Sequence, residues 1–274
     1  MSEYQYYEFR TLDRSLSEQQ IRELRACSTR ATITSTQFVN SYRWGDLRGD
    51  PRKWMEKYFD AFAYVANWGT HQLMFRFPRR WVDYKSIQRH CDGDAISSWA
   101  KDDIVVIRFI SQDEGGDSCD DDGEGWLSSL VPLRDDIARG DNRALYLAWL
   151  ASAQNRELSE TDLEPPVPDG LKELTPSLKA LTEFLRLDSH LVTAAAQTSS
   201  KMKALTGTKY ENWIKSLSVK DKTEWLLRFA SGEENRVDLE LLKLYLKEHP
   251  ERAMQKTKAR SVKSLLTSAR SMDE

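Results

Sequence analysis

The stretch DDIVVIRFI, residues 102–110, carries the strongest strand signal in this chain. Six of its nine residues are β-branched or aromatic, and such residues are enriched in strands. The apolar run is nearly continuous, so it predicts a strand that is buried on both faces. The N-terminal part of the fold is therefore expected to contain a sheet that includes this strand, and no strand order is predicted.

Strand and helix signals alternate ahead of this run. Four more segments predict strands, at residues 4–12, 31–42, 61–69 and 71–78. Ser17, followed three residues later by Gln20, predicts a helix start, and Asp50 followed by Pro51 predicts another. The expected fold class is α+β, with an N-terminal mixed sheet of about five strands and helices on one face.

Beyond residue 126 the sequence predicts only helices. The segment NRALYLAWLASAQ, residues 142–154, is apolar nearly all round and is expected to be buried. The polar, proline-rich segment at residues 155–170 predicts an extended connector. The predicted organisation is an α+β domain at 1–113, an acidic loop at 114–125 and a helical domain at 126–274.

Composition limits the class of protein. The 274 residues carry a formal net charge of −3, 40% hydrophobic residues and nine tryptophans, which argues against disorder and against a globally basic nucleic-acid binder. Three widely spaced cysteines fit a reducing compartment. The N-terminus lacks a signal-peptide pattern and no apolar run is long enough to cross a membrane, so we expect a cytoplasmic protein with no membrane partner.

The acidic segment SQDEGGDSCDDDGEGW, residues 111–126, invites a metal-site interpretation. With Gly123 at the sixth position of a calcium loop, the twelfth position falls on Ser129, which has no carboxylate. We therefore interpret the segment as a hydrated loop between two parts of the protein.

Other candidate metal or catalytic groups are sparse. The four histidines lack the spacing of a zinc site, and His90 beside Cys91 is interpreted as part of a surface turn. Asp46 and Asp50 in RWGDLRGDP, residues 43–51, are the candidates for a metal-dependent enzyme, although Asp50 also suits a helix cap. No cofactor, metal site or catalytic residue is predicted.

Two basic stretches are candidate binding surfaces. RFPRRWVDYKSIQRH, residues 76–90, interleaves cations with aromatic rings, which are the ingredients of single-stranded nucleic-acid binding. Its candidate residues are Arg79, Arg80, Trp81, Lys85 and Arg89.

The second stretch is RAMQKTKARSVKSLLTSAR, residues 252–270, which carries six basic residues and no acidic ones. It predicts a basic amphipathic helix that either packs back onto the protein or binds a protein partner. Its candidate partner-binding residues are Lys256, Lys258, Arg260, Leu265 and Leu266.

Most of the chain resembles a family of uncharacterised bacterial proteins. The resemblance rests on residues 6–70, from YYEFRTL to VANWGT, and continues through LRDDIARGDNRALYLAWLA at 133–151, EPPVPDGL at 164–171 and RSVKSLL at 260–266. The chain also resembles, more loosely, accessory proteins of CRISPR and other defence operons. The resemblance implies a bacterial, cytoplasmic protein of two parts, and it carries no activity, cofactor or catalytic residue.

The function that the sequence favours is that of a non-enzymatic interaction or regulatory protein, which docks a partner protein through its helical half. Aromatic residues and helical stripes are plentiful, whereas polar groups suited to catalysis do not cluster. The alternative is nucleic-acid binding through residues 76–90, and a third hypothesis is a metal-dependent enzyme.

Overall fold

An antiparallel sheet of seven strands occupies residues 5–112 in the computed structural model, which describes residues 3–113, 122–202, 207–231, 236–249 and 259–272. The strands lie in the order β2-β3-β1-β4-β5-β7-β6. They are β1 (Gln5–Arg10), β2 (Thr32–Ile33), β3 (Gln37–Tyr42), β4 (Ala61–Ala66), β5 (Thr70–Pro78), β6 (Ile96–Lys101) and β7 (Ile104–Gln112).

Helices follow the sheet, so the predicted α+β class is confirmed. Those within the sheet region are α1 (Glu18–Cys27), α2 (Pro51–Lys57) and α3 (Tyr84–Gln88), with a short 3₁₀ turn at Arg79–Trp81. The later helices are α4 (Trp126–Leu130), α5 (Pro132–Ala138), α6 (Arg143–Gln154), α7 (Pro176–Phe184), α8 (Ser189–Ala196), α9 (Thr208–Ser216), α10 (Val219–Ser231), α11 (Val237–Glu248) and α12 (Val262–Arg270).

The sheet differs from the prediction in its strand count and pairing. Every pair of neighbouring strands is antiparallel, so the sheet is not mixed. The predicted strand at 31–42 folds into the separate strands β2 and β3, which pair with each other. Strand β6 was missed because its sequence, ISSWAK, is mostly small and polar, and its pairing with β7 is what makes it a strand.

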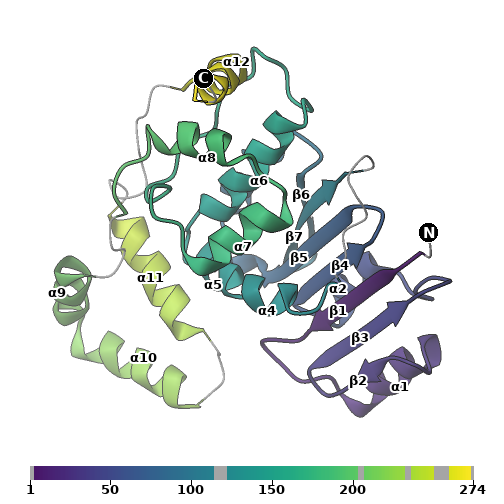
Figure 1. Ribbon diagram of the computed structural model, residues 1–274. Coiled ribbons are helices and arrows are strands. Elements are labelled where there is room, and N and C mark those ends of the chain that lie inside the picture. Colours follow the sequence, from purple (N-terminus) through teal and green to yellow (C-terminus); the bar gives the residue numbers. More distant parts are fainter. Residues whose placement is uncertain (1–2, 114–121, 203–206, 232–235, 250–258, 273–274) are drawn as a thin grey trace.

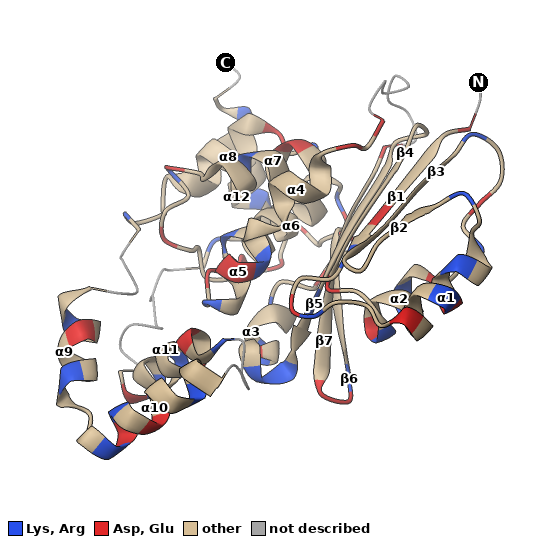
Figure 2. Cartoon of the chain, turned by 90° about the horizontal axis from the view of Figure 1, so that it is seen from below, with Lys and Arg blue, Asp and Glu red and all other residues tan. Residues whose placement is uncertain are grey.

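Helices cover both faces of the sheet, whereas one covered face was expected (Figures 1 and 2). On one face, Phe9, Phe38 and Phe62 pack with Trp54 and Met55 of α2. The opposite face carries another set of alternating apolar side chains, among them Phe75, Phe77, Val105, Ile107 and Phe109, which pack against the later helices. Strand β7 is apolar on both faces, and Met74 of β5 is buried on the α2 side, so each face requires its own layer of helices.

One continuous core joins the sheet to the helices of the C-terminal half. Helix α6 has eleven buried residues and runs through the middle of this core, as its all-round apolar sequence predicts. Helix α12 closes the same core through Val262, Leu265 and Ala269. Residues from both predicted domains therefore contribute to a single buried cluster.

Helices α9, α10 and α11 lie at the outer end of the molecule, away from the sheet (Figure 1). Trp213 of α9 packs with Leu242 and Tyr245 of α11 in a small cluster of its own. Leu239 of α11 reaches the main core and joins the two clusters. Within the described part of the chain, no helix is long and apolar enough to cross a membrane.

Candidate functional site

The basic stretch at 76–90 splits between the core and the surface. Arg79, Arg80, Lys85 and Arg89 are exposed, whereas the Trp81 ring is buried. The guanidinium of Arg134 lies 5.4 Å from the Trp81 ring centroid, and that of Arg236 lies 5.6 Å from it. A buried ring that already has two cations beside it is not placed to stack on a nucleic-acid base.

The C-terminal segment folds back onto the protein. Arg260 makes a bidentate ion pair with Glu164, with both N–O distances at 2.8 Å, and its remaining nitrogen donates to the carbonyl of Ala194 at 3.2 Å. The buried hydroxyl of Tyr146 also donates to Glu164. Arg260 is thus bound within the protein, because its charge neutralises a buried carboxylate.

The apolar residues of the same segment are also turned inward. Leu265 is fully buried and Leu266 is half-buried in the main core. Lys256 and Lys258, the other predicted partner-binding residues, lie outside the described residues. Of the two interpretations given for this segment, the structure shows packing back for Arg260 and Leu265.

The candidate metal and catalytic groups lie apart and have other partners. The Tyr7 hydroxyl donates to Asp46 at 2.7 Å, and Asp50 caps α2 by accepting from the backbone of Arg52 and Lys53. Burial raises the pKa of the Cys91 thiol, which disfavours the reactive thiolate. Across the described ranges, no three His, Cys, Asp or Glu side chains are grouped to hold a metal ion.

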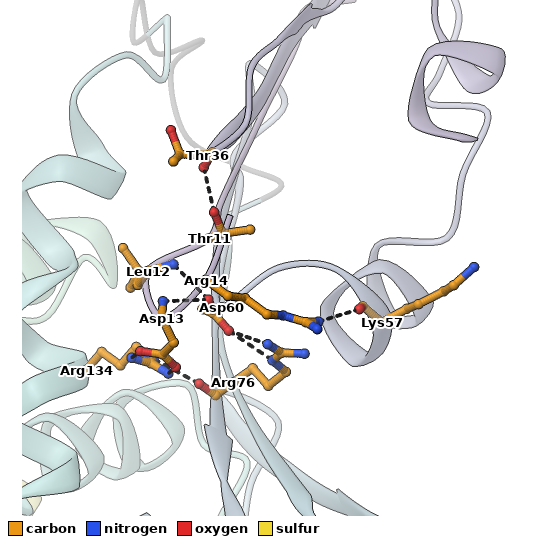
Figure 3. A network of polar contacts seen from close by, with 9 residues as sticks. All are labelled: Thr11, Leu12, Asp13, Arg14, Thr36, Lys57, Asp60, Arg76 and Arg134. Atoms are coloured by element: carbon orange, nitrogen blue, oxygen red, sulfur yellow. Dashed lines mark hydrogen bonds and ion pairs between the residues drawn. The ribbon is translucent and has the colours of Figure 1, made fainter. Parts of the chain in front are cut away.

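A network of ion pairs connects the sheet to α5 (Figure 3). Asp60 is fully buried and accepts from Arg76 at 2.5 and 3.1 Å and from the backbone amides of Leu12 and Asp13 at 2.7 and 3.1 Å. Asp13 pairs with both terminal nitrogens of Arg134, at 3.0 and 2.5 Å. These opposite charges satisfy one another, so removal of one partner would leave an uncompensated buried charge at the junction.

A cleft of about 450 Å³ lies beside this network, between α5 and the residue that precedes α11. Arg134, Asp135 and Arg236 line it, and each of the three belongs to an ion pair: Arg134 with Asp13, and Arg236 with Asp135. Each of these three charges has its partner within the protein. None of the three residues therefore offers an unpaired charge to a ligand in the cleft.

Helix α10 presents an apolar surface to solvent, and the sequence reasoning missed it. Val219 is 80% exposed, Leu226 67%, Leu227 65% and Phe229 74%. No residue of this 13-residue helix is buried. We call these four side chains the α10 face. Single exposed apolar residues are ordinary, but a group of large ones on one helix marks an interaction surface.

The polar side of α10 is turned toward α11. Arg228 donates to Glu240 of α11 at 2.6 Å, and its guanidinium lies 4.5 Å from the Trp225 ring centroid. Successive helical residues are about 100° apart, so Leu226 points almost opposite to Arg228. Helix α10 is thus held by its polar side, which leaves the α10 face on the outside.

Polar contacts hold α11 onto the body of the protein. Asp238 accepts from Arg139 of the α5 end at 2.6 Å, and Glu240 pairs with Arg80 at 3.3 Å. Arg236, the residue before α11, pairs with Asp135. These three contacts hold α11 on the body of the protein. Helix α10 is in turn held to α11 through Arg228 and Glu240.

The sequence did contain a signal for this surface. The run WLLRFA, residues 225–230, places large apolar residues on more than one side of a single helix. Such a helix requires either complete burial or a partner. In comparisons with protein-family models, curated proteins and solved structures, nothing matches this chain.

Proposed function

We propose that this chain is a non-enzymatic interaction protein that binds a partner protein through the α10 face of its helical half. The observation that carries the proposal is the exposure of Val219, Leu226, Leu227 and Phe229 on one helix whose polar side is already bound to α11. Covering exposed apolar surface of this kind is favourable, because it removes the surface from water.

Energetics support a binding role for this surface. Complete burial of a leucine or phenylalanine side chain contributes about 1.5–3 kcal/mol relative to its exposed state. A few residues carry most of the binding energy of an interface, and aromatic residues such as Phe229 are enriched there. The charged positions next to them, Lys220, Asp221 and Glu224, would form the polar rim of such an interface.

The other sequence-based hypotheses stay predictions. These are nucleic-acid binding through the exposed cations of residues 76–90 and a metal-dependent enzyme at Asp46 and Asp50. The bacterial origin, the regulatory role, the cytoplasmic location and the link to defence operons also stay predictions.

A photo-crosslinking experiment tests the docking proposal. A photoreactive amino acid at position 227, in the α10 face, is compared with the same amino acid at position 163, where Leu163 is 66% exposed on a different part of the protein. We expect a discrete cross-linked protein from position 227 in native lysate and none from position 163.

A double variant tests whether binding depends on the apolar side chains of the α10 face. Leu226→Ser with Phe229→Ser is expected to weaken binding of the cross-linked partner by at least about a hundredfold, because two anchor residues are lost. The control Leu163→Ser should bind as the unaltered protein does. A chain that stays monomeric and yields no discrete cross-link, or a double variant that binds normally, would contradict the proposal.

A further inference from the structure

A groove of about 370 Å³ lies on the sheet face that α2 partly covers. Strands β5, β6 and β7 form its floor, where Met74, Arg108 and Ser97 lie side by side across the sheet and Gln72 lies diagonal to Arg108. The start of α2 forms one wall. The α10 face lies in a different part of the fold, so this groove is independent of the proposed function.

Arg108 differs from the other internal arginines of this protein. Arg76 is paired with Asp60, Arg134 with Asp13, Arg143 with Asp141 and Arg260 with Glu164. The half-buried Arg108 has only the Ser97 hydroxyl, which accepts from its Nε at 3.0 Å. Among the residues that the structure describes, no carboxylate pairs with it, and its two terminal nitrogens point to no acceptor.

The neighbours of Arg108 add further donors. The Gln72 side chain is half-buried and makes no hydrogen bond within the described residues. The guanidinium of Arg52 lies 4.4 Å from the Trp99 ring centroid, and stacking on this ring holds it at the groove. Arg52 also pairs with Glu56 at 3.6 Å, so the donors left without a partner among the described residues are the Gln72 amide and the terminal nitrogens of Arg108.

Asp50 is the one acidic residue among the described residues that line the groove, and its carboxylate already has partners within the protein. Asp50 accepts from the backbone amides of Arg52 and Lys53 and lies 3.7 Å from the Lys53 ammonium. Because the Arg52 guanidinium is paired with Glu56, Arg108 is the guanidinium of the groove that has no carboxylate partner among the described residues.

We propose that this groove binds a small organic anion, whose carboxylate or phosphate group is held by the terminal nitrogens of Arg108. A guanidinium presents parallel N–H donors that match such a group bidentately, and pairs of this kind are strong when partly shielded from water. Arg52, which is paired with Glu56, adds a weaker attraction, and the Gln72 amide selects ligands with a polar group beside the anion. The volume suits a small molecule.

Thermal unfolding with added anions tests the proposal. The full-length protein is titrated with inorganic phosphate and, separately, with succinate, against potassium chloride of equal ionic strength, since salt alone changes charge screening. We expect a saturable rise in Tm with at least one of the two anions, because a ligand that binds only the folded state stabilises it. Phosphate and succinate distinguish the two anionic groups.

Two variants and one control locate the site. Arg108→Gln is expected to weaken anion binding at least about tenfold, since hydrogen bonds to charged groups are the strong ones. Arg52 lies on the surface, so the Arg52→Gln variant is expected to stay folded even if Arg108→Gln unfolds the protein. It should weaken anion binding several-fold. Arg89→Gln removes the same charge from an exposed position outside the groove and should leave binding unchanged.

Three results would overturn the proposal. The first is the absence of any Tm rise beyond that of chloride. The second is equal weakening by Arg89→Gln, which would indicate nonspecific attraction. The third is that a single-stranded oligothymidine binds more tightly than both small anions and that Arg108→Gln abolishes this binding. The groove would then bind a nucleic acid.

Discussion

At the scale of single residues, His90 illustrates how burial sets charge. Its Nδ1 donates to the carbonyl of Ser86 at 3.0 Å, whereas its Nε2 is buried and has no hydrogen-bond partner among the described residues. Burial lowers the pKa of His90 from 6.5 to about 4, because the charged ring would lose its hydration. The ring is therefore neutral in the folded protein at neutral pH.

This pKa predicts acid sensitivity. The unfolded chain binds a proton at His90 below about pH 6.5, whereas the folded protein does so only near pH 4, so the free energy of unfolding falls as the pH drops between these values. The difference amounts to about 3 kcal/mol in total. His90→Asn keeps a donor near Nδ1 and removes the titration.

Urea unfolding at pH 7 and pH 4.5 measures the effect. The unaltered protein should lose about 2–3 kcal/mol more than His90→Asn over this interval. Equal losses in the two proteins would show that His90 titrates normally in the folded state.

At the scale of elements, α10 and α11 contrast in how their leucines are used. Leu242 of α11 is buried against Trp213 and Tyr245, whereas Leu226 of α10 is 67% exposed. Both helices are amphipathic, but α11 packs its apolar side inward and α10 presents its own to solvent. The same residue type therefore stabilises the fold in one helix and is available for binding in the other.

A matched pair of substitutions tests this contrast. Leu242→Ala should lower the free energy of unfolding by about 2–5 kcal/mol, as is typical of a buried leucine. Leu226→Ala should change it by less than about 0.5 kcal/mol, as is typical of a surface position. The measurement is urea unfolding followed by far-UV circular dichroism, and a large loss in Leu226→Ala would mean that α10 is packed inside the fold.

At the scale of the whole molecule, the sheet and the later helices share one core. Leu145 of α6 is fully buried in the same cluster as Phe75 and Ile107 of the sheet. The ion pair between Asp13 of the sheet region and Arg134 of α5 links the same two parts (Figure 3). A shared core predicts that residues 1–113 and 126–202 unfold together.

Leu145→Ala tests this cooperativity. It should destabilise the protein by about 2–5 kcal/mol and shift tryptophan fluorescence and far-UV circular dichroism to the same lower urea midpoint. Two separated transitions, with only the helical signal shifted, would instead favour two independent domains divided near residues 114–125.

Local features were the part of the fold that the sequence determined. Ser17 forms the expected capping box with Gln20, Asp50 caps α2, and most of the run at 102–110 lies in strand β7, between β5 and β6. These features depend on atoms a few residues apart, so the sequence contains both partners. The burial of α6 also followed from its composition.

Contacts between distant residues were decided by the tertiary structure alone. Strand β6 exists because β7 pairs with it, Trp81 is buried beside Arg134 and Arg236, and Arg260 is bound to Glu164, which lies 96 residues earlier. The exposure of the α10 face and the lack of a carboxylate partner for Arg108 among the described residues belong to the same class. An amphipathic pattern states that a side chain prefers to be covered, but only the packed chain shows whether the protein itself covers it.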